Sequence, residues 1–210
     1  NLLKTFRVFI VMLGMLFSHV ALAQLSGTYT IDYSVSDAAG NAATVVQRTV
    51  IVNAAVASIY LENGTCKCPN AIVGDTISIS LDGINMTTIT VVDNSTIAGQ
   101  IANGNVNLCT SLVTSMEKLF AGNTSFNSDI SFWDTSNVAL MTSMFHVATS
   151  FNQNIGSWNV SNVTTMSSMF SGATNFNQNI GKWDVSKVTT ISSMFYNASS
   201  FNQDIGKWDV

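Results

Sequence analysis

Large apolar side chains recur every 25 residues in the second half of the chain. The interval is kept by one set of Trp, two sets of Phe and one set of Val positions: Trp133, Trp158, Trp183 and Trp208; Phe120, Phe145, Phe170 and Phe195; Phe126, Phe151, Phe176 and Phe201; Val113, Val138, Val163 and Val188. A fixed period between about 20 and 50 residues is typical of proteins built from structural repeats. The pattern therefore predicts four repeat units between residues 110 and 210.

Within one unit, the apolar spacing changes from that of a strand to that of a helix. Trp158 and Val160 lie two residues apart, which places both side chains on one face of a strand. A helical stripe with i, i+3, i+4 and i+7 spacing follows, made of Met166, Met169, Phe170 and Ala173. Ser161 is a suitable N-cap for this helix. We therefore expect an α/β repeat solenoid with one short strand and one short helix in each 25-residue coil.

The residue that closes the predicted helix differs between units. Gly122, Gly172 and Asn197 suit the left-handed conformation that ends many helices. Val147 occupies the same position in the second unit, where a β-branched residue at positive φ would be strained. We expect the helix of the second unit to end in a different way.

The first 23 residues have the pattern of an export signal. Lys4 and Arg7 precede an apolar run over residues 8–17, and small residues lead to Ala21-Leu22-Ala23. This order of a positive region, an apolar region and an A-x-A site is typical of a secretory signal peptide. The alternative, a transmembrane anchor, needs about 20 apolar residues, which is more than this run provides. We predict a signal peptide at residues 1–23 and no membrane span in the mature chain.

Two β-rich segments separate the predicted signal from the repeats. In residues 24–58, polar and apolar residues alternate from Tyr29 to Val35, a turn follows at Ala39-Gly40-Asn41, and a second β-rich run covers 44–52. An isolated hairpin is marginal in water, so we interpret this segment as part of a domain. In residues 59–109, runs at 77–81 and 88–92 predict a hairpin around Asp82-Gly83. We interpret this second segment as a β-rich leader and N-terminal cap.

The leader contains three cysteines, Cys66, Cys68 and Cys109. The first two are too close to bridge each other without strain, so we expect one of them to form a structural disulfide with Cys109. A zinc site would need a fourth ligand, and neither His19, in the predicted signal peptide, nor His146, inside a repeat, is suitable. A catalytic thiol would need a neighbouring base, which the sequence does not offer. We predict no metal site, no cofactor and no catalytic residue.

Composition narrows the class of protein. Charged residues make up 10% of the chain, against a usual quarter, while Ser, Thr and Asn account for 70 of 210 residues. The net charge of −4 leaves no basic patch for a nucleic-acid backbone. The hydrophobic content of 47% is too high for intrinsic disorder. These values favour a folded, exported protein with a polar surface and exclude nucleic acid as a partner.

Three segments of the repeat carry a resemblance to a known family: Val163-Thr164-Thr165-Met166-Ser167-Ser168-Met169-Phe170, then Phe176-Asn177-Gln178-Asn179-Ile180-Gly181, then Trp183-Asp184-Val185-Ser186. Residues 109–210 resemble the BspA-like leucine-rich-repeat surface proteins of bacteria. The stretch Asn63-Gly64-Thr65-Cys66-Lys67-Cys68-Pro69 resembles the leader of such arrays, and residues 27–52 resemble the last two strands of bacterial immunoglobulin-like modules. The resemblance implies a leucine-rich-repeat-like fold, surface exposure, an adhesive or protein-binding role, and no catalytic residues.

Two outward positions flank each repeated Trp and form the candidate binding face. This face comprises Phe132, Asp134, Ser157, Asn159, Lys182, Asp184, Lys207 and Asp209. The first position of each pair varies, whereas the second is always Asp or Asn. The tryptophans could instead stack on sugars, although Trp in phase with a strand favours the core. The carboxylates could recruit calcium, although lysines two residues earlier favour cross-strand ion pairs.

The sequence therefore favours a non-enzymatic bacterial cell-surface protein that binds an unidentified protein or cell-surface ligand through its repeats. The alternatives are an accessory repeat stalk of a larger secreted enzyme and a carbohydrate-binding surface module. An array that stops at Val210 lacks a polar terminal unit, so we expect a truncated array whose native chain continues.

Overall fold

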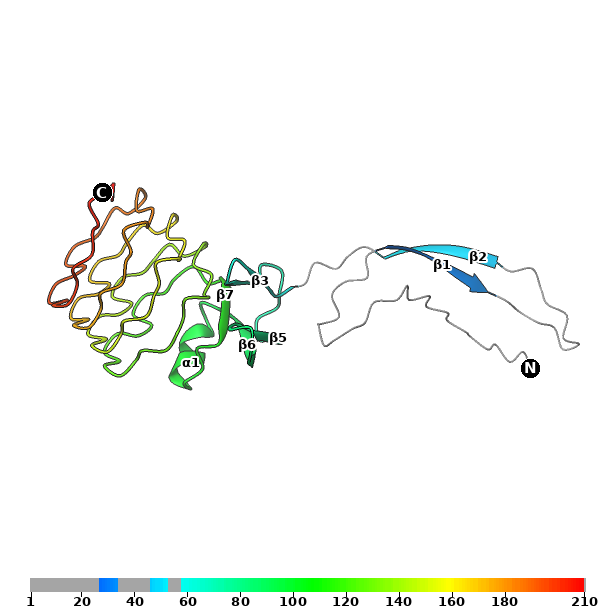
Figure 1. Ribbon diagram of the computed structural model, residues 1–210, viewed down its shortest axis with the longest axis horizontal. Helices are drawn as coiled ribbons and strands as arrows, with labels where there is room; N and C mark the ends of the chain where they lie inside the picture. Colours follow the sequence, from blue (N-terminus) through cyan, green and yellow to red (C-terminus); the bar gives the residue numbers. More distant parts are fainter. Residues whose placement is uncertain (1–26, 34–45, 53–57, 210) are drawn as a thin grey trace, which may run out of the picture. The chain divides into compact units, whose positions relative to one another are not determined.

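The computed structural model describes residues 27–33, 46–52 and 58–209, which fall into two units, residues 1–57 and residues 58–210. In the first unit, β1 (Gly27–Tyr33) pairs with β2 (Val46–Val52) in an antiparallel hairpin (Figure 1). The hairpin predicted from the alternating pattern is therefore confirmed. The predicted signal peptide and the turn at Ala39-Gly40-Asn41 lie outside the described residues.

The leader of the second unit starts with a short hairpin. β3 (Tyr60–Glu62) and β4 (Thr65–Lys67) are antiparallel and are joined by Asn63 and Gly64, which have φ angles of 51° and 82°. Asn-Gly suits this two-residue turn because both residues tolerate positive φ. The hairpin places Cys66 at its centre, opposite Leu61.

A three-stranded sheet in the order β5-β6-β7 completes the leader (Figure 1). β5 (Thr76–Ser80) and β6 (Met86–Asp93) form the predicted hairpin, and β7 (Leu108–Leu112) lies parallel to β6. α1 (Ile97–Ala102) connects β6 to β7 and is the one helix in the described part of the chain, which the sequence pattern did not predict. No described helix has the length and apolar character needed to cross a membrane.

The repeat units do not form the expected α/β repeat solenoid. Their described residues, 113–209, consist of consecutive turns, and isolated parallel bridges link Ser115, Leu140, Thr165 and Thr190. Neither a helix nor a strand longer than one bridge is present in this range. The prediction of a leucine-rich-repeat-like strand and helix in each unit is therefore wrong. The protein has small β-sheets followed by turn-rich repeat units.

Hydrogen bonds between units explain why the helix is absent. Alternate N–H groups of the third unit donate to carbonyl oxygens of the fourth at 2.7–2.9 Å; the donors are Met166, Ser168, Phe170 and Gly172. The intervening N–H groups donate three residues back in their own unit; these are Met169, Ser171 and Ala173. An α-helix would instead commit successive N–H groups to carbonyls four residues back. The apolar spacing that predicted a helix therefore occurs here in a run of turns, which is hydrogen-bonded to the next repeat unit.

Each unit has two residues in the left-handed region, again at 25-residue intervals. The first set is Lys118, Ser143, Ser168 and Ser193, and the second is Gly122, Val147, Gly172 and Asn197. Val147 has a φ of 57°, like its equivalents, so the expectation that the second unit closes differently is wrong. Its N–H donates to the Ser171 carbonyl oxygen at 2.7 Å, which helps to hold this conformation.

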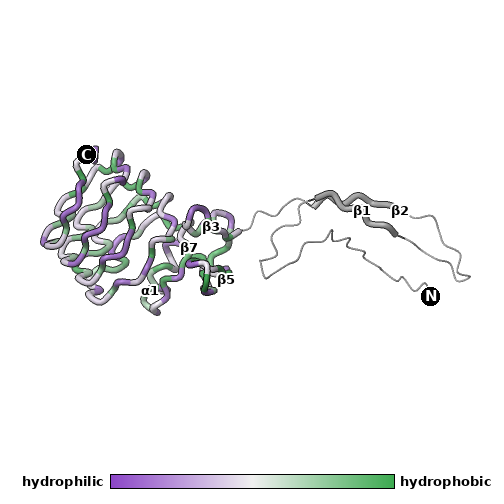
Figure 2. Tube along the Cα trace, viewed as in Figure 1, coloured by the Kyte–Doolittle hydropathy of each residue, from purple (hydrophilic) through white to green (hydrophobic). Residues whose placement is uncertain are grey.

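The inward positions predicted from the 25-residue period do form the core. Phe145 stacks on Phe120 and on Phe170 with ring centroids 5.5 Å apart and planes within 4° of parallel. Trp133, Trp158 and Trp183 are no more than 4% exposed. Figure 2 shows apolar and polar stretches alternating along the units. The periodic pattern therefore identified the buried side chains correctly, although it gave the wrong backbone.

Asparagine side chains link the units on their polar side. The Asn152 N–H donates to Asn127 Oδ1 at 2.9 Å, and Gln153 Nε2 donates to the Asn127 carbonyl oxygen at 2.9 Å. Asn177 and Gln178 repeat both contacts on Asn152. These hydrogen bonds between neighbouring units account for the Phe-Asn-Gln motif.

Candidate functional site

The candidate binding face is exposed in three of the four units. Its exposed members are Ser157, Asn159, Lys182, Asp184, Lys207 and Asp209. Phe132 and Asp134, in the first unit, are 5% and 3% exposed. The leader covers them: the Cys66 N–H donates to the Phe132 carbonyl oxygen at 2.8 Å, and Lys67 Nζ donates to Asp134 Oδ1 at 2.8 Å. The expectation that Phe132 and Asp134 are exposed is therefore wrong.

The constant Asp or Asn of the face forms a turn. Asn159 Oδ1 accepts hydrogen bonds from the N–H and the hydroxyl of Ser161, and Asp184 Oδ1 accepts the same pair from Ser186. The hydrogen bonds from Ser186, together with the charge of Lys187, hold the pKa of Asp184 below its ordinary value. Asp and Asn are interchangeable here because each offers an Oδ1 acceptor. The constancy of this position is therefore explained by backbone geometry.

The ion pairs expected beside this turn do not form. The described residues contain one ion pair, Lys67 with Asp134, and it does not involve Lys182 or Lys207. The same part of the chain contains no group of three or more His, Cys, Asp or Glu side chains placed to hold a metal.

Asp134 joins the leader to the first repeat unit through a buried cluster. Its Oδ1 accepts from Lys67 and Ser136, and its Oδ2 accepts from the Ser111 hydroxyl at 2.6 Å. Burial raises the pKa of Asp134, but hydrogen bonds from Lys67, Ser111 and Ser136 outweigh it and hold the pKa below its ordinary value. Every buried side-chain nitrogen and oxygen in the described residues has a partner. The cluster is thus a satisfied structural network.

Sequence reasoning missed Lys67 and Ser111 as partners of Asp134. They lie 67 and 23 residues before it, on β4 and β7. A signal was present in the Cys66-Lys67-Cys68 order, because in extended backbone a lysine next to a buried cysteine points to the opposite face. What that lysine meets depends on where the leader packs.

The cysteines form one disulfide, between Cys68 and Cys109. The predicted pairing of one C-x-C member with Cys109 is confirmed. Cys66 keeps a free, buried thiol, and burial, with a smaller contribution from the charge of Asp134, raises its pKa to about 12. Thiolate chemistry needs the ionised form, which both burial and the raised pKa disfavour at Cys66.

The repeated tryptophans offer no stacking platform in the first three units. The indole Nε1–H of Trp158 donates to the Ile130 carbonyl oxygen, and that of Trp183 donates to the Ile155 carbonyl oxygen, both at 3.2 Å. A sugar ring needs an exposed aromatic face, which these two buried side chains lack. Their indole groups stabilise the contact between neighbouring units.

The variable position of the face lies between two fixed ones. Ser157, Lys182 and Lys207 each follow a Gly and precede the core Trp. A Cβ added at Gly156 or Gly181 would clash with a main-chain oxygen of the next unit, so these glycines are required by close approach. The residue between the glycine and the tryptophan of each unit points outward to solvent, so close approach between units does not limit its size. This row can change without disturbing the fold.

Family models match two parts of the chain. Residues 22–52, which include β1 and β2, match a model described as bacterial surface protein, Ig-like domain. Residues 114–210 match a model described as Mycoplasma protein of unknown function, DUF285. No curated protein and no solved structure matches the chain. The resemblance to bacterial immunoglobulin-like modules is confirmed, whereas the assignment to BspA-type leucine-rich repeats is not. Both matched domain types are consistent with a bacterial surface protein.

Proposed function

We propose that this is an exported, non-enzymatic surface protein that binds a protein or another cell-surface ligand through the variable row Ser157, Lys182 and Lys207. One observation carries the proposal. In the second and third units, the glycine before the row lies against a main-chain oxygen of the next unit and the tryptophan after it is buried, while the exposed residue between them is Ser in the second unit and Lys in the third and fourth. A rigid frame with a variable outer row is the arrangement expected of a binding scaffold.

The charges of the row indicate the kind of ligand. Lys182 and Lys207 stand at equivalent positions of neighbouring units, and neither forms an ion pair within the described residues. Two adjacent ammonium groups favour a ligand that presents carboxylates or other acidic groups. Attraction between exposed charges is screened by salt, so the binding should weaken as ionic strength rises.

The test uses beads coated with the full chain and counts their attachment to cultured epithelial cells and to bacterial cells. The double variant Lys182→Ser with Lys207→Ser should reduce attachment at least fivefold. Ser157 occupies the same position in the second unit, so the substitution places a residue that this site already accepts.

Lys118→Ser is the matched control. It removes one positive charge, against two in the double variant, from another exposed position, where Ser143, Ser168 and Ser193 are the equivalents in the other units. The control should attach like the parent protein. Full attachment of the double variant would show that the row does not bind. Loss of attachment in both the double variant and Lys118→Ser would show that net charge, and not the row, determines attachment.

A further inference from the structure

One position of the 25-residue pattern carries a different residue in every repeat unit. It is occupied by Ala121, His146, Ser171 and Tyr196, which directly follow the core phenylalanines of the four units. Within residues 113–209, no other position of the pattern differs in all four units, and His146 and Tyr196 are the only His and the only Tyr. We call these four residues the second variable row.

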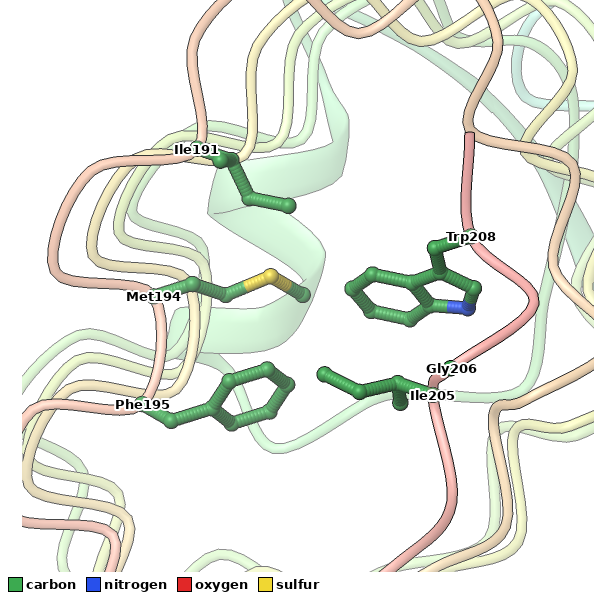
Figure 3. A pocket seen from close by; sticks show the side chains of 6 residues that line it. All are labelled: Ile191, Met194, Phe195, Ile205, Gly206 and Trp208. Atoms are coloured by element: carbon green, nitrogen blue, oxygen red, sulfur yellow. The ribbon is translucent and has the colours of Figure 1, made fainter. Parts of the chain in front are cut away.

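The second variable row points away from the core. Figure 3 shows the side chains of Met194 and Phe195 turned toward Trp208, and the ring centroids of Phe195 and Trp208 are 6.3 Å apart. Tyr196, the next residue, is 66% exposed. His146 is exposed as well, although a repeat unit lies on either side of it. The exposure of this row is therefore a property of its place within each unit.

Main-chain hydrogen bonds place three members of the row side by side. The Val147 N–H donates to the Ser171 carbonyl oxygen, and the Gly172 N–H donates to the Tyr196 carbonyl oxygen, both at 2.7 Å. The core phenylalanine rings one residue earlier follow one another at 5.5 and 5.8 Å. Ser171, which has a short side chain, is 6% exposed. It therefore forms the low centre of the row, between the larger side chains of His146 and Tyr196.

The polar groups of these three side chains are not used to link the units. Around the row, that role belongs to Thr149 and Thr174, whose hydroxyl groups donate to carbonyl oxygens of the preceding unit. The imidazole of His146 and the hydroxyl groups of Ser171 and Tyr196 take no part in these links. Each of the three groups has both donor and acceptor capacity, which is available to a ligand.

The surroundings of the row carry no charge. Residues 138–181 and 188–203 contain no Asp, Glu, Lys or Arg, and their polar side chains are mainly those of Ser, Thr, Asn and Gln. Lys182 and Lys207 lie outside both ranges. A charged ligand would lose hydration here without gaining an ion pair. The matching ligand is therefore uncharged and rich in hydrogen-bonding groups.

We propose that the second variable row binds a neutral oligosaccharide across His146, Ser171 and Tyr196. A pyranose ring presents C–H groups on its faces and hydroxyl groups around its edge. The exposed Tyr196 ring covers such an apolar face and keeps its own hydroxyl group at the rim, while His146 and Ser171 exchange hydrogen bonds with sugar hydroxyls. Because His146 and Tyr196 are two units apart, a chain of sugars is needed to reach both.

A protein partner fits this surface less well. The centre of a protein–protein interface is largely apolar and excludes water. In the described repeats, Val147 is the one large aliphatic side chain that is exposed, and its equivalent in the fourth unit is Asn197. The hydroxyl and amide groups around the row instead match a ligand that is itself rich in hydroxyl groups.

The experiment immobilises the full chain and measures the binding of linear hexasaccharides of glucose, of mannose and of N-acetylglucosamine. At least one hexasaccharide should bind, and the matching monosaccharide should bind at least tenfold more weakly. The affinity should change less than twofold between about 0.05 and 0.5 M sodium chloride, because no ion pair contributes to it.

The double variant His146→Ser with Tyr196→Ser should bind the hexasaccharide at least tenfold more weakly. Serine is the residue of the third unit at this position, so the repeat accepts it, and urea unfolding followed by Trp fluorescence should match the parent. Tyr196→Phe keeps the ring and should bind within threefold of the parent. Lys182→Ser with Lys207→Ser is the matched control and should bind like the parent.

Three outcomes would overturn the proposal. Binding of none of the hexasaccharides would show that the row does not recognise neutral sugar chains. Equal binding by the parent and the His146→Ser, Tyr196→Ser variant would place the sugar elsewhere. Loss of binding in the lysine variant would assign the sugar to the lysine row. Cell attachment is measured separately, so failure of the sugar site leaves the proposed binding function of the lysine row untouched.

Discussion

Val147 has a φ of 57° at a position that two other units fill with glycine. The left-handed conformation costs a β-branched residue roughly 1–2 kcal/mol, and glycine adopts it freely. Val147 is 38% exposed, so its removal sacrifices little apolar burial. We expect Val147→Gly to raise the free energy of unfolding by about 1 kcal/mol, after the greater flexibility of glycine in the unfolded chain is included. Urea unfolding followed by Trp fluorescence measures this change.

Asn197→Gly is the control for this prediction. Asn197 has a φ of 56° at the equivalent position, and asparagine tolerates the left-handed region better than other residues with a side chain. The free energy of unfolding should change by less than about 0.5 kcal/mol. If Val147→Gly lowered stability, the packing of the partly buried Val147 side chain would outweigh the backbone strain.

Asp134 has two partners that its equivalents lack, the Lys67 ammonium group and the Ser111 hydroxyl. Asn159 shows that an amide can form the same turn, so Asp134→Asn should keep the turn and lose the ion pair. Because Lys67 is 21% exposed and partly screened, we expect a cost of about 2 kcal/mol in the free energy of unfolding. Chemical unfolding at pH 7 measures it.

The pH dependence of that cost has a defined sign. The pKa of Asp134 is lower in the folded protein than its ordinary value of 3.8, so the stabilisation is complete above that value and is lost as pH falls through the folded pKa. The stability difference between the parent and Asp134→Asn should therefore shrink below pH 4. Asp184→Asn, at an exposed turn where the carboxylate forms no ion pair, should change stability at pH 7 much less than Asp134→Asn. An equal loss in both variants would assign the effect to the turn.

The repeat element shows which features of a sequence determine side-chain burial and which determine the backbone. Every 25th residue lies in an equivalent environment, so the period placed Phe170 and Trp183 in the core correctly. The i, i+3, i+4 spacing is shared by a helix and by the observed run of turns, so spacing alone could not separate them. Ser168 and Gly172 have positive φ, and alternate N–H groups donate to the next unit. Both features are incompatible with an α-helix and define a run of turns. The high content of Ser, Thr and Asn, which are poor residues for helix interiors, was a signal against the helix.

The stacked phenylalanines stabilise the repeat units more in the third unit than in the fourth. Phe170 is fully buried between Phe145 and Phe195, whereas Phe195 is partly exposed. Phe170→Ala should lower the free energy of unfolding by about 3–5 kcal/mol, and Phe195→Ala by roughly half as much. Urea unfolding of the pair tests this order. Equal costs would mean that the side chain of Phe195 is as well covered as that of Phe170.

Residues 58–209 share one hydrophobic cluster, which runs from Ile59 and Cys66 in the leader to Val185 and Met194 in the repeats. The sequence predicted a leader, a hairpin and a disulfide, and each prediction concerned local or covalent chemistry. It could not predict that β4 covers Phe132 and Asp134, because this contact depends on how two segments about 67 residues apart pack together. The expected exposure of the candidate face is therefore observed in the second to fourth units and is wrong in the first unit, which the leader covers.

The shared cluster predicts that the disulfide stabilises the repeats as well as the leader. Cys68 and Cys109 are 41 residues apart, and a bridge across such a loop contributes about 2–4 kcal/mol. The four tryptophans lie in the repeats, so Trp fluorescence reports their unfolding and not that of the leader alone. Reduction with dithiothreitol should shift the single fluorescence transition in urea to lower concentration. The double variant Cys68→Ala with Cys109→Ala should show the same shift and no response to the reductant. An unchanged fluorescence transition after reduction would mean that the repeats fold without support from the leader. The contacts of Asn94, Ile97 and Leu108 with the first unit would then contribute nothing to the stability of the repeats.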